Sequence, residues 1–194
     1  MHDIEPYHKW RNHYISSEDE RSPFYGKVYD EFTFSNKVYN YFIHPQWDEF
    51  GSQTLYGKIL YVDYSASFAC IELIGEWNDC ISNDIMFLKR EVIDALTCHD
   101  ITKFVVFCDN VMNFHNSDDS YYEEWYDDVK EEGGWITFVN TFDHVLKEME
   151  SVRLQNYVNI GKMYNEMNWR KLKPAAILSH LEFLMNNSIK QLTY

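Results

Sequence analysis

Residues 104–108 read Phe-Val-Val-Phe-Cys, a short apolar run between the charged residues Lys103 and Asp109. An uninterrupted run of this length is typical of a strand that is buried on both faces of a sheet. Residues 135–139, Trp-Ile-Thr-Phe-Val, form a second run of the same kind. The segment from about Ser120 to Glu132 places its apolar residues on one arc of a helix. The order strand, helix, strand predicts a parallel pair joined by a right-handed crossover.

Two further strands are expected before this unit. Residues 58–64 and 68–75 both alternate along the chain, with Phe68, Cys70 and Glu72 on one face of the second strand. Only Ser-Ala-Ser separates the two segments, and so short a connection can join strands only in antiparallel order. The sheet is therefore expected to be mixed.

Helical spacing appears at two more places. Apolar residues predict a helix over about residues 84–98, with Lys89 and Arg90 on its solvent side, and another helix over about residues 143–152. Residues 55–152 then follow the order β-β-α-β-α-β-α. The predicted fold class is α/β, with a mixed, mostly parallel sheet covered by helices.

The flanking regions differ from this core in composition. Residues 1–54 are an aromatic-rich extension, in which a hairpin is expected to turn near Ser35 and Asn36. Residues 153–194 hold six basic side chains against two acidic ones, and Pro174 is placed to start a last helix. This region is expected to be a basic helical tail.

Composition narrows the classes of partner. Lys and Arg number 17 against 31 Asp and Glu, a formal net charge of −14. An acidic body repels nucleic acid and anionic membrane, so neither is an expected partner. The chain begins without the features of a signal peptide, and its four cysteines include no C-x-x-C pair, so we expect a reduced, cytoplasmic protein. With 7 glycines there is no glycine-rich phosphate cradle, and no cofactor is expected.

The stretch around the end of the predicted central strand resembles one known family. Asp109 follows the strand, an apolar segment over residues 111–114 comes next, and Ser117 lies shortly before the next helix. This arrangement and the order of elements resemble the STAS domain of bacterial anti-sigma-factor antagonists and of transporter tails. In that family the Ser is phosphorylatable and is usually followed by Gly, where this chain has Asp118. The resemblance implies a binding or regulatory scaffold rather than an enzyme.

Polar groups gather in the predicted loop over residues 109–119, after the carboxyl end of a strand, where open α/β sheets place ligands. The candidate binding residues in this loop are Asp109, Asn113, His115, Ser117, Asp118 and Asp119. A structural alternative explains most of them. His115 would be exposed, Ser117 or Ser120 would cap the helix, and the two Asp residues would lie at the positive end of its dipole.

A second candidate loop, residues 75–79, adds Glu76 and Asp79 to the predicted binding residues. If the two strands are parallel, Glu76 and Asp79 share an edge with Asp109 and His115. Carboxylates beside a histidine form a plausible general acid/base set, and a metal-assisted hydrolase is the enzyme alternative. The structural alternative is a turn with a helix cap. No nucleophile motif of the G-x-S-x-G type supports an enzyme.

The predicted helix over residues 120–132 has a strongly acidic face. Eight carboxylates lie within residues 118–132, where Lys130 is the one cation. A solvated surface is one interpretation, and a docking surface for a basic protein partner is the other. The basic tail of the same chain, or of a second copy in a homodimer, is one such partner.

The sequence thus favours a non-catalytic STAS-like domain that binds a protein partner. Its contact surface is expected to be the acidic helix or the loop over residues 109–119. The alternatives are a metal-assisted or other acid/base enzyme and a self-assembling structural protein.

Overall fold

The computed structural model describes residues 4–30 and 32–191, with side chains described as far as residue 187. One basic residue of the predicted tail, Lys190, therefore has a side chain outside the described part.

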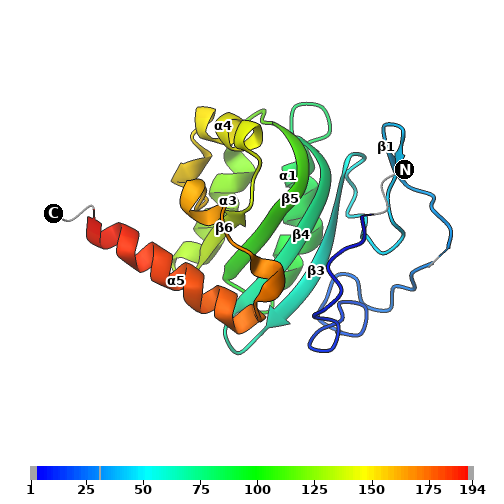
Figure 1. Cartoon of the computed structure of the whole chain (residues 1–194), viewed down its shortest axis with the longest axis horizontal. Helices are drawn as coiled ribbons and strands as arrows, with labels where there is room; N and C mark the ends of the chain where they lie inside the picture. Colours follow the sequence, from blue (N-terminus) through cyan, green and yellow to red (C-terminus); the bar gives the residue numbers. More distant parts are fainter. Residues whose placement is uncertain (1–3, 31, 192–194) are drawn as a thin grey trace.

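A mixed sheet forms the centre of the molecule (Figure 1). Its strands lie in the order β3 (Leu55–Asp63), β4 (Phe68–Asn78), β5 (Lys103–His115) and β6 (Trp135–Val139). The pair β3 and β4 is antiparallel, whereas β4–β5 and β5–β6 are parallel. The predicted α/β fold with a mixed, mostly parallel sheet is confirmed.

The helices that follow strands β4, β5 and β6 cover one face of this sheet. They are α1 (Asp84–Phe87), which continues through the π-helical segment η1 (Leu88–Ile93) into α2 (Asp94–Thr97), then α3 (Ser120–Lys130) and α4 (Asp143–Ser151). Their apolar residues, such as Leu88, Trp125 and Met149, share one core with Phe104 and Phe138 of the strands. The wider π turn rotates the helix against its predicted phase, and Lys89, predicted to face solvent, is buried.

Parts of both flanking regions cover the opposite face. Trp10 from the N-terminal region and Trp169 from the C-terminal region pack with Phe107 of β5 and with Ile177. The rings of Phe107 and Trp169 are stacked, with centroids 3.8 Å apart. The C-terminal region contains the short 3-10 turns η2 (Leu154–Asn156), η3 (Lys162–Tyr164) and η4 (Trp169–Lys171), and then α5 (Pro174–Gln191). The last helix begins at Pro174, as predicted.

A small hairpin of β1 (Lys37–Val38) and β2 (Tyr41–Phe42) lies in the N-terminal region. It is shorter than predicted and turns at Tyr39, which has a φ of 52°, rather than at Ser35 and Asn36. Val28, expected in its first strand, is 91% exposed. The N-terminal region contacts the sheet through Asp48, whose backbone exchanges two hydrogen bonds with Gly57 of β3.

The central strands continue further than the sequence indicated. Residues 75–78 belong to β4 and residues 109–115 to β5, so both predicted loops begin inside strands. Trp77 and Phe114 are buried in the helical core and give these extensions an apolar face. Gly75 permits the irregular register here, because its φ is +120° and a Cβ would lie 2.0 Å from the Thr54 carbonyl oxygen.

Candidate functional site

Two of the predicted binding residues, Glu76 and Asn113, meet each other. They are paired in the register of β4 and β5, and Asn113 Nδ2 donates to Glu76 Oε1 at 2.7 Å. The hydroxyl of Tyr39 donates to the other carboxylate oxygen. Glu76 is buried and anchors the hairpin to the sheet.

Asp79 is buried just beyond β4, on the helical side of the sheet. Its carboxylate accepts hydrogen bonds from Trp77 Nε1 at 3.1 Å, from the backbone nitrogen of Ile85 at 2.8 Å and from the Tyr122 hydroxyl at 2.7 Å. Burial raises the pKa of Asp79 to about 6, although these donors oppose the shift. The contacts tie β4 to the starts of α1 and α3.

Asp109 lies within β5 and is held by three donors. Its Oδ1 accepts from Arg170 Nη1 at 2.7 Å and from Asn140 Nδ2 at 3.2 Å, and its Oδ2 accepts from Trp169 Nε1 at 2.9 Å. Two of these donors, Trp169 and Arg170, come from the C-terminal region. Arg170 is 61 positions away from Asp109 in the sequence. Asp109 therefore fixes that region against the sheet.

Glu72 completes the same network from β4. It is fully buried; its Oε1 lies 2.7 Å from Arg170 Nη2, and its Oε2 accepts from the backbone nitrogen of Tyr7 at 2.8 Å. Burial raises the pKa of Glu72 to about 7, against the opposing effects of these partners. One local pattern indicates this buried acid, because Glu72 shares a strand face with the apolar residues Phe68 and Cys70.

The predicted convergence of Glu76, Asp79, Asp109 and His115 is wrong. Each carboxylate has its own set of partners, and His115 is exposed, while its carbonyl oxygen accepts from the Asp79 backbone nitrogen. Because β5 continues past Asp109, this residue lies about 13 Å along the strand from Asn113, the neighbour of Glu76. Among the residues that the structure describes, no group of three or more His, Cys, Asp or Glu side chains is placed to hold a metal ion.

Ser117, Asp118 and Asp119 lie between β5 and α3, and Ser117 is exposed. Asp118 accepts from the backbone nitrogen and the hydroxyl of Ser120, and Asp119 accepts from the Tyr157 hydroxyl at 2.9 Å. The expectation that a serine caps α3 is wrong, because Asp119 occupies the cap position and Asp118 binds the Ser120 hydroxyl.

The acidic face of α3 has basic neighbours that the sequence did not assign to it. Lys89 Nζ lies 2.8 Å from Asp128 Oδ2, and Arg90 Nη1 lies 2.6 Å from Glu124 Oε1. Within the described residues, the tail uses Arg170 for Glu72 and Asp109 instead of α3. Among the described residues, no ion pair joins a basic side chain of the tail to α3, and docking of the tail on this face, within one chain or between two copies, stays a prediction.

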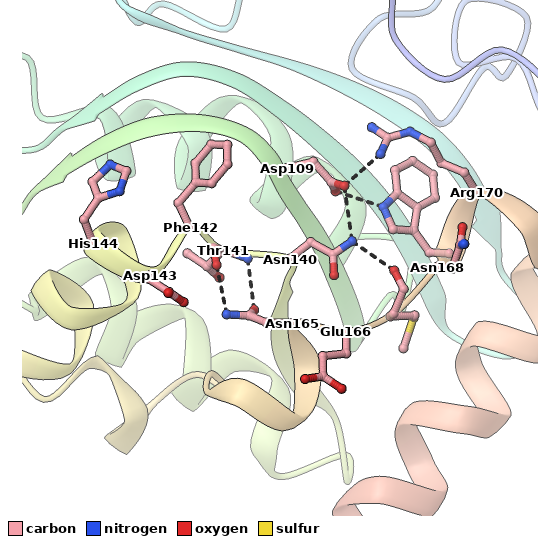
Figure 2. Close-up of a pocket in the computed structure, with 12 residues that line it drawn as sticks. Asp109, Asn140, Thr141, Phe142, Asp143, His144, Asn165, Glu166, Asn168 and Arg170 are labelled. Atoms are coloured by element: carbon pink, nitrogen blue, oxygen red, sulfur yellow. Dashed lines mark hydrogen bonds and ion pairs between the residues drawn. The ribbon is translucent and has the colours of Figure 1, made fainter.

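A polar cavity of about 740 Å³ opens near the carboxyl end of β6 (Figure 2). It is bounded by Asp109, by residues 140–144, which lead from β6 into α4, and by residues 165–170, which lead into η4. This is the end of a parallel sheet at which open α/β folds bind ligands. We take this cavity as the candidate functional site.

Asn140 and Asn165 join the two walls of the cavity. Asn140 Nδ2 donates to the carbonyl oxygen of Met167 at 3.0 Å as well as to Asp109. Asn165 Oδ1 accepts from the Thr141 backbone nitrogen at 3.0 Å, and Asn165 Nδ2 donates to the Thr141 carbonyl oxygen at 2.9 Å. Asn140 Oδ1 and Thr141 Oγ1 are buried without a hydrogen-bond partner. The cavity walls thus hold two unused polar atoms.

The rim of the cavity is partly apolar. Phe142 is 41% exposed, and its ring stacks on His144 with centroids 5.8 Å apart. His144 Nε2 lies 2.7 Å from the carbonyl oxygen of Met112, a residue that is 38% exposed. The rim therefore continues from α4 onto β5.

Sequence reasoning found Asp109 but missed the other residues of the cavity. Asn140 and Thr141 directly follow the buried run over residues 135–139. The rule that ligand sites lie after the carboxyl ends of parallel strands, which led to the loops over residues 75–79 and 109–119, also predicts these two residues. Residues 165–168 carry no such signal, because they reach the site only through the path of the C-terminal region over the sheet.

In the part of the chain that the structure describes, no helix is long and apolar enough to cross a membrane. The sequence matches no protein-family model and no curated protein.

Proposed function

We propose that this chain is a cytoplasmic, non-catalytic binding domain of the STAS-like type, which binds a protein partner at the carboxyl edge of its sheet. The observation that carries the proposal is the cavity of about 740 Å³ whose walls hold two buried polar atoms without partners. Buried polar groups are nearly always hydrogen-bonded in folded proteins. The two atoms lie beneath the cavity surface, so a bound group would pair with them once the Asn140 or Thr141 side chain turns toward the cavity.

The order of elements supports the STAS-like part of the proposal. Residues 55–151 contain the order β-β-α-β-α-β-α, and the helices between the strands pack on one face of the sheet. Ser117 is exposed between β5 and α3, where the resemblance places its serine. These features support a scaffold that presents loops to a partner.

The rim supports a protein as the ligand. Phe142 and Met112 are large apolar side chains that reach solvent beside the polar cavity. Aromatic residues and methionine are enriched in protein interfaces, where they anchor binding while polar groups at the margin set orientation.

The acid/base alternative receives less support from the same geometry. A general base must lie within hydrogen-bond reach of the proton that it removes. Asp79 and Asp109 each already accept three hydrogen bonds, and Glu76 accepts two. The proposed hydrolase set is dispersed rather than assembled.

Photo-cross-linking tests the proposal. A benzophenone amino acid is placed at Phe142, at Met112 or, as a control, at Val28, which is exposed in the N-terminal region. The protein is then irradiated in the cells that produce it. We expect one protein adduct that is shared by positions 142 and 112 and absent at position 28. Adducts of equal yield at all three positions, or none at positions 142 and 112, would contradict the proposal.

A second candidate function is self-association through the tail. Phe183 of α5 is 62% exposed, and Figure 1 shows α5 extending past the edge of the sheet. The tail also presents Lys171 and Lys173, which are exposed and basic, to the acidic surface of a second copy. Sedimentation at low and high salt tests this candidate, for which we expect dimers that dissociate as salt increases. A monomer at both salt concentrations would exclude it.

A further inference from the structure

The cavity holds unused acceptors and excess negative charge at the same place. Asn140 Oδ1 is an acceptor only, and the Thr141 hydroxyl can accept as well. Both atoms are buried without partners, and the Thr141 side chain lies in the cavity wall with 5% of the residue exposed. Figure 2 shows the amide nitrogen of Asn140 turned toward Asp109 and its oxygen turned away.

Carboxylates outnumber cations around this space. Asp109, Asp143 and Glu166 line the cavity together with Arg170 and His144. The guanidinium of Arg170 is already paired, at 2.7 Å, with Asp109 and with the buried Glu72 behind it. Asp143 and Glu166 are exposed at the rim and keep their charge available to a ligand.

An anionic ligand does not fit this distribution. The start of α4 would attract an anion through its backbone N–H groups, but Asp143 lies in the first turn of that helix. Arg170 is the one lysine or arginine among the described residues that line the cavity. Its guanidinium is already paired with two carboxylates, which offset its charge toward an anionic ligand. A cationic donor meets the carboxylates at the rim, and it reaches the acceptors of Asn140 and Thr141 once these buried side chains turn toward the cavity.

We infer that the cavity binds a protonated amine or guanidinium group that a basic segment of the partner protein presents. This inference rests on the proposed function and adds the chemistry of the partner to it. A volume of about 740 Å³ lies within the range of binding sites for ligands much larger than one side chain. The occupant is therefore a short peptide stretch with a Lys or Arg, whose backbone and neighbours contact the rim at Phe142.

An NMR titration of the full chain tests the inference. The probes are Nα-acetyl-lysine amide and Nα-acetyl-arginine amide, with Nα-acetyl-norleucine amide as the uncharged control of similar shape. We expect saturable amide shifts at Thr141, Asp143 and Asn165 with both cationic probes. The norleucine probe should produce shifts at least about fivefold weaker, and high salt should weaken cationic binding. Equal binding of the norleucine probe would overturn the inference.

Matched variants separate a specific site from general attraction to an acidic protein. The double variant D143N/E166Q removes two charges from the rim, and E131Q/E132Q removes two charges beyond the end of α3. We expect the first pair to weaken cationic binding by about three- to tenfold and the second to leave it unchanged. T141V, which removes the hydroxyl at nearly constant shape, should also weaken binding. Equal effects of the two charge pairs would overturn the inference.

The source of the amine is tested with a free diamine. If putrescine binds more than about tenfold tighter than the lysine probe, the ligand is a small metabolite, and the inference that a side chain of the partner protein occupies the cavity is overturned. Failure of the inference differs from failure of the proposed function. If the norleucine probe binds equally while the Phe142 adduct remains, the protein partner is supported and the inference that its segment is basic is contradicted. If the cationic probes bind but no adduct forms, the proposed function as a protein-binding domain is contradicted.

Discussion

Nη2 of Arg170 lies 2.7 Å from Oε1 of Glu72, although 98 positions separate the two residues in the sequence. Glu72 is fully buried in β4, and the side chain of Arg170 is 40% exposed. The same guanidinium contacts Asp109 of β5, so it bridges two neighbouring strands. The C-terminal region is thereby tied to the centre of the sheet at one wall of the candidate site.

Replacement of Arg170 should destabilise the protein. R170A leaves the carboxylate of Glu72 buried without its countercharge, and we expect the free energy of unfolding to fall by about 3 kcal/mol at pH 8. K171A, which removes an exposed neighbour, should change it by less than about 0.5 kcal/mol. Urea denaturation measures both values. Similar losses for the two variants would show that the buried pair has no special role.

The pKa of Glu72 predicts a pH dependence of stability. Its folded-state pKa, about 7, is above the ordinary glutamate pKa of 4.5, because burial disfavours the carboxylate. The folded state therefore holds this proton where the unfolded state has lost it. The resulting stabilisation is fully present below about pH 4.5 and is lost as the pH rises to 7.

The difference in unfolding free energy between the wild type and E72Q isolates this contribution, because Gln does not titrate. We expect the free energy of unfolding of the wild type to fall relative to that of E72Q between pH 5 and 7, and the difference to be constant above pH 8. Denaturation at a series of pH values provides the measurement. A difference that stays constant from pH 5 to 7 would show that Glu72 is already ionised at pH 5.

Asp79 should be more important to stability than any one of its donors. D79A leaves an indole N–H, a backbone N–H and the Tyr122 hydroxyl without an acceptor in a buried site, and we expect a loss of about 3 kcal/mol. Y122F removes one hydrogen bond and should cost about 1 kcal/mol. Thermal unfolding of both variants tests the ranking, and a Y122F loss equal to that of D79A would contradict it.

The neighbouring cations Lys89 and Arg90 should differ in their contributions. Lys89 is buried and contacts Asp94 and Asp128, whereas the side chain of Arg90 is 46% exposed. K89M keeps the aliphatic stem but removes the charge from among the acids, and should lower the free energy of unfolding by about 2 kcal/mol. R90M should have a much smaller effect, which high salt abolishes. Denaturation with and without salt compares them, and equal losses would refute the assignment.

Local patterns were sufficient for the order of the elements. The runs over residues 104–108 and 135–139 are buried on both faces, and the helices beside them follow their apolar spacing, because each pattern depends on neighbours within a few residues. Lys89 shows the limit of this reasoning. A regular helix places it in solvent, and the π turn that buries it is stabilised by contacts with α3.

The sequence by itself determined the fold class, the acidic surface and the presence of polar residues after the strands. Only the tertiary structure decided where the strands end and which polar groups share a site. The change from apolar to polar residues at Asp109 predicted the end of a strand there. In the structure β5 continues to His115, because Phe114 is buried in the helical core. Asn165 and Arg170 reach Thr141 and Asp109 only when the C-terminal region crosses the sheet, and such long-range contacts leave no local periodicity in a sequence.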